Sequence, residues 1–336
     1  MTPYYAGVTV VSSFDVTVVP PVCQPPASPA SELICEWERR NFNMGQYDKS
    51  ALVVINPAAG LGNAGEYSSA ITNRLSAHGF DSSVITLDPQ NGLIPNKPIS
   101  DYKDADLILC CGGDGSLFHI VNEMITHESG AAIGVIPFGN TNSFAKAMGI
   151  AENFDSALDA ALGGKPFRYD TGKINDKYFN SVASFVSCSS MSYVTSQQMK
   201  SIADYSKHIL RAIGELNMKI GSAFHMTIES ETGKTEGNFI YGAVSNISAA
   251  DSKTNDGIME LFLLRSPETH TEALDILNVL RNGSFDHPAI ITSKVTGGSF
   301  SADTDISLSL DGEFGGVLRD FQFDVLKEKL TVMTPV

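Results

Sequence analysis

Three apolar segments between residues 51 and 138 each run directly into a turn that contains glycine. The segments and the glycines that follow them are ALVVIN (51–56) with Gly60, ADLILCC (105–111) with Gly112 and Gly113, and AAIGVIPF (131–138) with Gly139. Helical patterns separate these segments, and strands that alternate with helices predict a parallel sheet. Such sheets bind ligands at the carboxyl ends of their strands, where all three turns fall. The segment therefore predicts a ligand-binding α/β domain.

The pattern changes near residue 165, after which short strand-like segments dominate and two helices are expected near residues 197–216 and 272–281. The strand-like segments are residues 177–186, 223–230, 238–247, 258–264, 289–295, 306–314 and 321–326. This series of short strand-like segments predicts an antiparallel β-rich domain. We therefore expect an α/β plus β fold, with N-terminal strands and a proline-rich linker over 1–48, an α/β domain over 49–165 and a β-rich domain over 166–336.

Composition excludes several classes of partner and site. A formal net charge of −15 disfavours nucleic acid, because phosphate backbones are bound by clustered Lys and Arg. The five cysteines are odd in number and form no C-x-x-C pair, which argues against a disulfide framework and a zinc site. No apolar run approaches the roughly 20 residues of a transmembrane helix, and the first residues lack a basic leader. We expect a cytoplasmic protein.

The strongest chemical motif is GGDGS at residues 112–116, between an apolar strand and an amphipathic helix. Paired glycines allow the backbone to approach a phosphate, and the helix N-terminus adds unpaired N–H donors and a positive dipole. Asp114 would repel that anion unless it holds Mg²⁺ or accepts a proton from an attacking hydroxyl. The simpler interpretation is a tight turn in which Asp114 caps the helix.

Taken with four other segments, this motif resembles the lipid kinases related to diacylglycerol, sphingosine and ceramide kinases. The segments are NPAAG (56–60), PFGNTNSFA (137–145), NDGIME (255–260) and DGE (311–313), and the resemblance extends from about residue 51 to residue 336. It implies an N-terminal α/β domain that binds ATP, a β-rich domain that binds lipid, and an active site in the cleft between them.

The resemblance also implies roles for individual residues. Asp114, Asp311 and Glu313 are the expected catalytic residues, and Asp114, Asp311 and Asp256 the expected Mg²⁺ ligands, although a plain Asx turn also accounts for Asp256. The expected nucleotide residues are Asn56, Gly60, Thr86, Gly112, Gly113, Gly115, Ser116, Gly139, Asn140, Thr141, Asn142 and Arg211. Asp204 is expected to meet the lipid head group, with a solvated helix face as the alternative for Asp204 and Arg211.

Three departures from the family pattern leave other functions open. His119 replaces a usual Glu, Asn140 and Thr141 replace Thr-Gly, and Ser143 replaces an Asp. These changes are compatible with a regulatory pseudokinase that binds lipid and nucleotide without turnover. An NAD kinase shares the GGDG turn, and Asn122 with Glu123 would then be its dinucleotide pair rather than helix surface.

For the lipid kinase we expect ATP and Mg²⁺ as cofactors. The expected substrate is a lipid such as diacylglycerol, a sphingoid base or ceramide, with peripheral membrane contact. A homodimer is left open.

Overall fold

The computed structural model describes residues 49–88, 90, 93–187, 223–246 and 254–336, and Tyr47–Val336 form one compact unit. The predicted N-terminal strands and linker (1–48), the predicted helix at 197–216, Asp204 and Arg211 lie outside the described residues. Among the described residues, no helix is both long enough and apolar enough to span a membrane.

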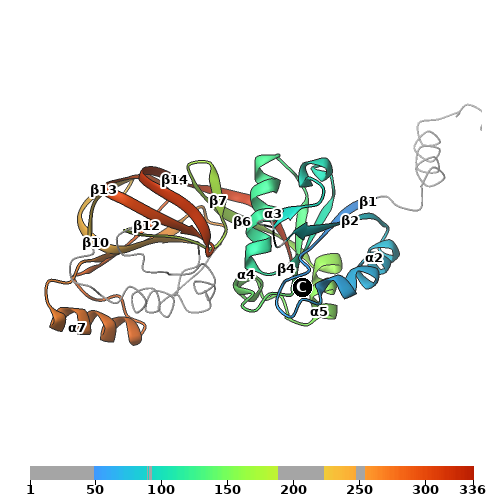
Figure 1. The fold of residues 1–336 in the computed structure, drawn as a ribbon, viewed down its shortest axis with the longest axis horizontal. Coiled ribbons are helices and arrows are strands. Elements are labelled where there is room, and N and C mark those ends of the chain that lie inside the picture. The colour runs from blue at the N-terminus through green and yellow to red at the C-terminus, as the bar shows by residue number, and fades with distance from the viewer. Residues whose placement is uncertain (1–48, 89, 91–92, 188–222, 247–253) are drawn as a thin grey trace, which may run out of the picture. The chain divides into compact units, whose positions relative to one another are not determined.

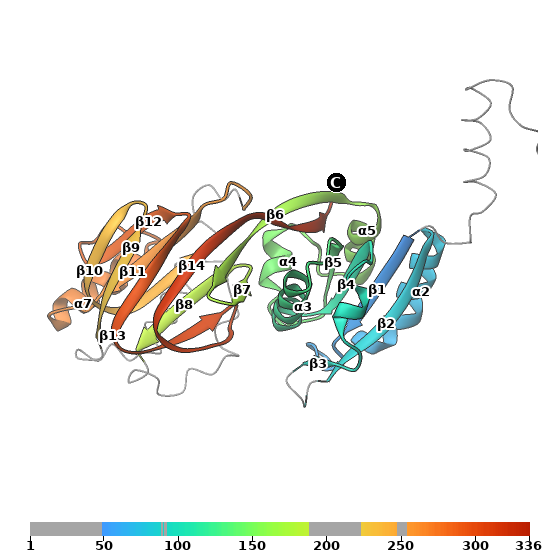
Figure 2. The ribbon, with the colours of Figure 1, turned by 90° about the horizontal axis from the view of Figure 1, so that it is seen from above.

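Four parallel strands form the centre of the N-terminal region. β1 (Lys49–Ile55) pairs in parallel with β2 (Phe80–Asp88) on one side and with β4 (Leu107–Gly112) on the other, and β5 (Ala132–Pro137) pairs in parallel with β4. Figure 2 shows β5, β4, β1 and β2 side by side in this order. All six residues of β4 are buried, which explains why its sequence is continuously apolar instead of alternating.

Helices pack against this sheet (Figure 1). They are η1 (Ala64–Tyr67), α2 (Ser68–Ala77), η3 (Ile99–Tyr102), α3 (Asp114–Thr126), α4 (Ser143–Ala147) and α5 (Phe154–Gly163), and a short strand β3 (Ile94–Pro95) pairs with β2. The α3 helix buries Leu117, Ile120, Val121 and Met124, the spacing of an amphipathic helix on a sheet. Its N-terminus therefore points out at the carboxyl end of β4.

The C-terminal region is rich in antiparallel strands, as expected. Its elements are β6 (Lys165–Ile174), β7 (Lys177–Phe179), β8 (Val182–Ser187), β9 (Phe224–Ser230), β10 (Gly233–Ser245), β11 (Met259–Arg265), α7 (His270–Arg281), β12 (Ile290–Val295), β13 (Gly297–Leu310) and β14 (Glu313–Thr334). Two predicted strands are wrong in detail. Residues 177–186 form β7 and β8 with a break between them, and residues 306–314 contain the tight turn between β13 and β14, where Asp311 and Gly312 have φ values of 51° and 89°.

Two long strands, β6 and β14, connect the regions. They pair with each other in an antiparallel ladder, and Thr331 and Val332 near the end of β14 also pair in parallel with β5. Tyr169, Leu330 and Val332 pack in the core of the α/β region. The ladder of described strands is therefore continuous across residue 165. The boundaries 49–165 and 166–336 stay a prediction, and below we call these segments the α/β region and the β-rich region.

Candidate active site

The three glycine turns of the α/β region meet at the carboxyl ends of β1, β4 and β5. Gly60 has a φ of 54°, and a Cβ atom there would overlap the carbonyl oxygen of Phe138. A Cβ atom on Gly139 would lie 2.6 Å from the Cα atom of Gly113. The Phe138 N–H donates to the Gly112 carbonyl over 2.9 Å. Only glycine allows the backbones to approach this closely, so the spacing of the motifs reflects contact between the turns.

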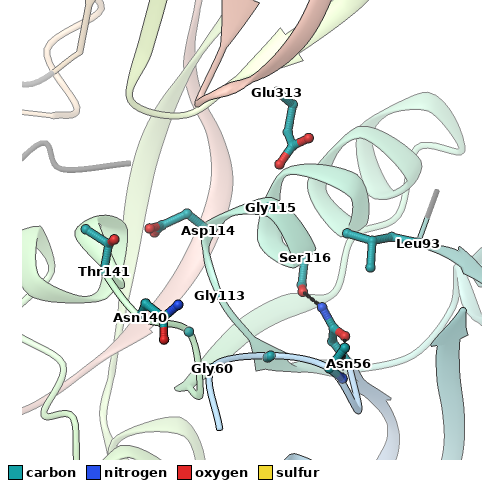
Figure 3. A pocket seen from close by; sticks show the side chains of 13 residues that line it. Asn56, Gly60, Leu93, Gly113, Asp114, Gly115, Ser116, Asn140, Thr141 and Glu313 are labelled. Carbon is teal, nitrogen blue, oxygen red and sulfur yellow. Dashed lines mark hydrogen bonds between the residues drawn. The ribbon is translucent and has the colours of Figure 1, made fainter. Parts of the chain in front are cut away.

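These turns and the first turn of α3 line a cavity of about 280 Å³ (Figure 3). Its lining residues are Asn56, Ala58, Ala59, Gly60, Leu93, Gly113, Asp114, Gly115, Ser116, Gly139, Asn140, Thr141 and Glu313. Within it the Asn56 amide donates to Ser116 Oγ over 2.8 Å and accepts from the Ala58 N–H over 3.0 Å. Asn56 therefore ties the first turn to α3. The unpaired N–H groups in the first turn of α3 are suited to bind an anion at this end of the cavity.

Eight of the predicted nucleotide residues line this cavity, and a ninth, Gly112, adjoins it. Asn142 and Thr86 have different surroundings. Gly112 ends β4, directly before the cavity. Asn142 is buried beneath the Gly139 turn, donates to the Gly139 carbonyl over 2.6 Å, and has no partner for Oδ1 among the described residues. Thr86 does not line the cavity, and its N–H donates to the Asn96 side chain over 3.1 Å. Ala58, Ala59 and Leu93 also line the cavity, and the sequence did not predict them, because apolar side chains carry no sign of ligand chemistry.

Asp114 occupies the first position of α3, and its carboxylate extends to α4. Oδ2 accepts from the Ser143 N–H over 3.0 Å, and Oδ1 accepts from the Phe144 N–H over 3.1 Å. The side chain therefore caps α4, whose own N-cap residue, Asn142, makes no side-chain cap hydrogen bond. Asp114 also borders the cavity. The cap that the sequence suggested is real, but the capped helix is α4 instead of α3.

Asp311 is buried in the turn between β13 and β14, and its carboxylate accepts three backbone N–H groups. The donors are Asn180 at 2.7 Å, Ser181 at 2.8 Å and Val182 at 3.0 Å. Burial raises the pKa of Asp311 to about 6; the three N–H donors act in the opposite direction, and the charge of Asp114 adds to the rise. Asp311 and Asp114 share a gap of about 10 Å³, room for one water molecule at most. Asp311 thus holds the turn in place.

Glu313, two residues further on, lines the cavity of about 280 Å³. Figure 3 shows its carboxylate directed toward the start of α3, where Gly115 and Ser116 lie. The turn is supported from β7, since the Lys177 ammonium donates to the Gly315 carbonyl over 2.9 Å. Glu313 and Asp114 are thus the two carboxylates that line this cavity.

Two further predicted residues lie away from the cavity. Asp256 accepts from the Ile258 N–H over 3.0 Å, which is an Asx turn, and no group of three or more His, Cys, Asp or Glu among the described residues is placed to hold a metal. Asn122 is not ordinary helix surface, because its side chain exchanges hydrogen bonds of 3.0 and 2.9 Å with the backbone of Tyr178 in β7. These two hydrogen bonds join α3 to β7, and they leave the Asn122 side chain unsuited to binding a dinucleotide.

A valine at Gly113 tests whether the contact between the turns is needed for nucleotide binding. Gly113 has a φ of −105°, open to any residue, so the effect of the substitution is steric: the new Cβ would lie 3.0 Å from Gly139 Cα. Overpacking costs about 1–3 kcal/mol, so we expect ATP affinity to fall by about 10- to 100-fold in calorimetric titration. Gly130→Val is the control, since a Cβ there meets nothing within 4 Å. Equal ATP affinity in the two folded variants would place the nucleotide elsewhere.

Comparison with known proteins gives one consistent result. Residues 50–174 match the model of the diacylglycerol kinase catalytic domain. The diacylglycerol kinase of Staphylococcus saprophyticus is 26% identical over 294 residues, which cover 85% of this chain and 96% of the relative. The diacylglycerol kinase of Staphylococcus aureus strain MRSA252 is 26% identical over 280 residues, 80% of this chain and 88% of the relative.

Solved structures show that the fold is shared. A crystal structure described as a diacylglycerol kinase of Bacillus anthracis superposes with a TM-score of 0.62 at 18% identity, covering 87% of this chain and 98% of the other. Another structure from the same organism gives a TM-score of 0.67 at 20% identity with the same coverage. The matched domain contains the NPAAG, GGDGS and PFGNTNSFA turns that line the cavity. Residues 50–174 of this chain thus match the diacylglycerol kinase catalytic domain, and the chain is similar to bacterial diacylglycerol kinases over most of its length.

Proposed function

We propose that this protein transfers the γ-phosphoryl group of ATP to a hydroxyl of a lipid, with diacylglycerol, the substrate in the names of its relatives, as the first choice. The observation that carries the proposal is that the Glu313 carboxylate faces the N-terminus of α3 across one cavity. Phosphate at the helix N-terminus and a hydroxyl beside Glu313 would then share that cavity. This is the arrangement that phosphoryl transfer needs, because its catalysis rests on alignment and charge neutralisation.

The charges around the cavity support a requirement for Mg²⁺. Of the described residues that line it, none is Lys or Arg, and the two charged ones are Asp114 and Glu313. Backbone N–H groups alone offset little of the charge of a triphosphate. Mg²⁺ binds through one or two carboxylates together with phosphate oxygens and water, and Asp114 is the residue of the cavity that would hold the ion. When bound, the ion would neutralise charge that develops on the phosphate oxygens.

The three carboxylates have different roles in this reaction. Glu313 accepts the proton of the lipid hydroxyl. The hydroxyl oxygen forms the new bond to the γ-phosphorus. The bond between that phosphorus and the β,γ-bridging oxygen of ATP breaks at the same time, and ADP is released. Asp311 holds the turn that presents Glu313. Asp114 holds α4 and the Asn140–Thr141 turn beside the phosphates. Asp311 is a positioning residue in this scheme, because its carboxylate accepts three backbone N–H groups.

The finer features of the family follow as parts of the same proposal. The α/β region would bind ATP and the β-rich region would bind the lipid, with the active site between them. Asp204 and Arg211, which lie outside the described residues, would meet the lipid head group and ATP. Contact with the membrane would be peripheral and the protein cytoplasmic, and Asp256 would hold a structural cation in its Asx turn.

A phosphorylation screen tests the proposed function. The purified chain is incubated with labelled ATP, Mg²⁺ and mixed micelles that contain diacylglycerol, monoacylglycerol, a sphingoid base or ceramide, and labelled lipid is counted. We expect transfer to one lipid class, and its loss when EDTA removes Mg²⁺. ATP binding without transfer to any of the four lipids would favour the pseudokinase, which the changed residues Asn140, Thr141 and Ser143 bring into consideration. Transfer to NAD in a parallel assay would favour the NAD kinase.

A further inference from the structure

Glu313 lies two residues before a β-bulge in the hairpin that β13 and β14 form. In the register of these two strands, the residues on either side of Gly315 have partners on β13, and Gly315 is the extra residue between them. A Cβ atom at Gly315 would lie 2.8 Å from Leu308 Cβ and 2.9 Å from Leu310 Cγ, so the bulge requires glycine. A bulge bends its strand and changes the direction of nearby side chains. The geometry of this bulge therefore affects where the Glu313 side chain lies.

One short segment, residues 177–182, holds the hairpin on both sides of Glu313. On one side, the backbone N–H groups at the end of the segment donate to the Asp311 carboxylate over 2.7 to 3.0 Å. On the other side, the Lys177 ammonium donates to the Gly315 carbonyl over 2.9 Å. Gly315 is buried, and a buried carbonyl is unfavourable without a donor, so Lys177 stabilises the bulge. Glu313 therefore lies between two points that the same segment fixes.

The same segment is also bound to α3, whose N-terminus would bind phosphate in the proposed function. Tyr178, the neighbour of Lys177, exchanges two backbone hydrogen bonds with the Asn122 side chain on α3, at 2.9 and 3.0 Å. The hairpin and α3 are thus joined through β7. The distance from Glu313 to the start of α3 depends on these contacts, and the Lys177 contact comes from an exposed residue that can be changed without disturbing a core.

We propose that Lys177 is a positioning residue for Glu313. Its hydrogen bond fixes the bulge at Gly315, and the bulge sets the place of the Glu313 carboxylate in the cavity. The inference rests on the proposed function, because Glu313 is the group that would accept the proton of the lipid hydroxyl. Lys177 does not line the cavity, so its effect comes through alignment. A displacement of about 1 Å is enough to slow a reaction that depends on alignment.

Substitution of Lys177 tests the proposal in the phosphorylation assay. Lys177→Met keeps most of the length of the side chain and removes its hydrogen-bond donor. We expect kcat to fall by about 10- to 100-fold, with KM for ATP and the unfolding temperature close to wild type. Lys177→Arg keeps a donor and should restore most of the lost kcat. Lys234→Met is the control and should keep the wild-type kcat, because Lys234 on β10 pairs with Glu236 over 3.2 Å instead.

A double-variant cycle shows whether the effect passes through Glu313. If Lys177 acts by placing that carboxylate, Lys177→Met has little left to change once Glu313→Gln has removed the base. We expect Lys177→Met to lower kcat by less than about twofold in the Glu313→Gln chain, because residues that act as a unit are not additive. An equal loss of kcat in both backgrounds would overturn the proposal, since independent effects multiply.

Hydrogen exchange measures the hold on the hairpin without relying on activity. In the full chain, the backbone amides of residues 311–318 should exchange faster in Lys177→Met than in wild type, because the hairpin opens locally more often. Lys177→Arg and Lys234→Met should leave these amides at the wild-type rate. Unchanged exchange in Lys177→Met would overturn the proposal.

The two proposals fail in different ways. A wild-type chain that phosphorylates no lipid would contradict the proposed function, whereas hydrogen exchange would still decide whether Lys177 holds the hairpin. An active wild-type chain whose Lys177→Met variant keeps its kcat would overturn the role of Lys177 and leave the kinase intact. A loss of kcat that Lys177→Arg does not restore would also overturn it, because the donor would then not be what matters.

Discussion

We expect Glu313→Gln to lower the kcat of lipid phosphorylation by about 10²–10⁴-fold, the range that general base catalysis contributes. Glutamine keeps the size and shape of the side chain but cannot accept the proton of the lipid hydroxyl. Because the side chain lines the cavity and glutamine has nearly the same size, the fold should tolerate the change. The expected result is therefore a large loss of kcat with little change in ATP affinity or unfolding temperature.

The measurement is the transfer of labelled phosphate from ATP to lipid, together with calorimetric titration of ATP and thermal unfolding. Asp324→Asn is the matched control, because Asp324 is an exposed carboxylate further along β14. It should keep wild-type turnover. If Glu313→Gln turned over lipid at close to the wild-type rate, the base would have to be another group, and Asp114 would be the next candidate on the cavity.

Asp114→Asn should lose both turnover and stability, which separates it from Glu313→Gln. Both oxygens of Asp114 accept backbone N–H groups of α4, at 3.0 and 3.1 Å. An amide can accept only one of them and turns its own NH₂ toward the other donor, so one N–H of α4 is left unpaired. Loss of such a cap costs about 0.5–2 kcal/mol of unfolding free energy. Turnover should fall further, since the neutral side chain no longer attracts Mg²⁺ with full charge.

Urea unfolding of Asp114→Asn gives the stability cost, and the phosphotransfer assay at a temperature well below unfolding gives kcat as a function of Mg²⁺. Raising Mg²⁺ should recover part of the lost rate. Asp155→Asn is the control for an acidic residue in the first turn of a helix, because Asp155 is 80% exposed and forms only a surface ion pair with Arg74. A variant that is destabilised but keeps its kcat at ordinary Mg²⁺ would limit Asp114 to the cap of α4.

The order of the elements around the site could be predicted from the sequence because the signals are local. Continuous apolar runs mark strands that are buried on both faces, and the observed β1, β4 and β5 fall at the predicted segments. Glycine at residues 60, 113 and 139 marks close backbone approach, which the structure shows between the turns. The helix α4 escaped prediction because its five residues are too few for a periodic pattern, and the apolar periodicity of α5 was not recognised.

The sequence by itself determined the parallel α/β unit, the β-rich region after it and the set of turns that carry the chemistry, since each depends on the chemistry of neighbouring residues. Only the tertiary structure decided the surroundings of each carboxylate. Asp311 and Glu313 are two residues apart and both acidic, yet Asp311 is buried and accepts three N–H groups from residues about 130 positions away, whereas Glu313 lines the cavity. The partners of a side chain across such a distance depend on how strands pair and pack, which no local pattern encodes.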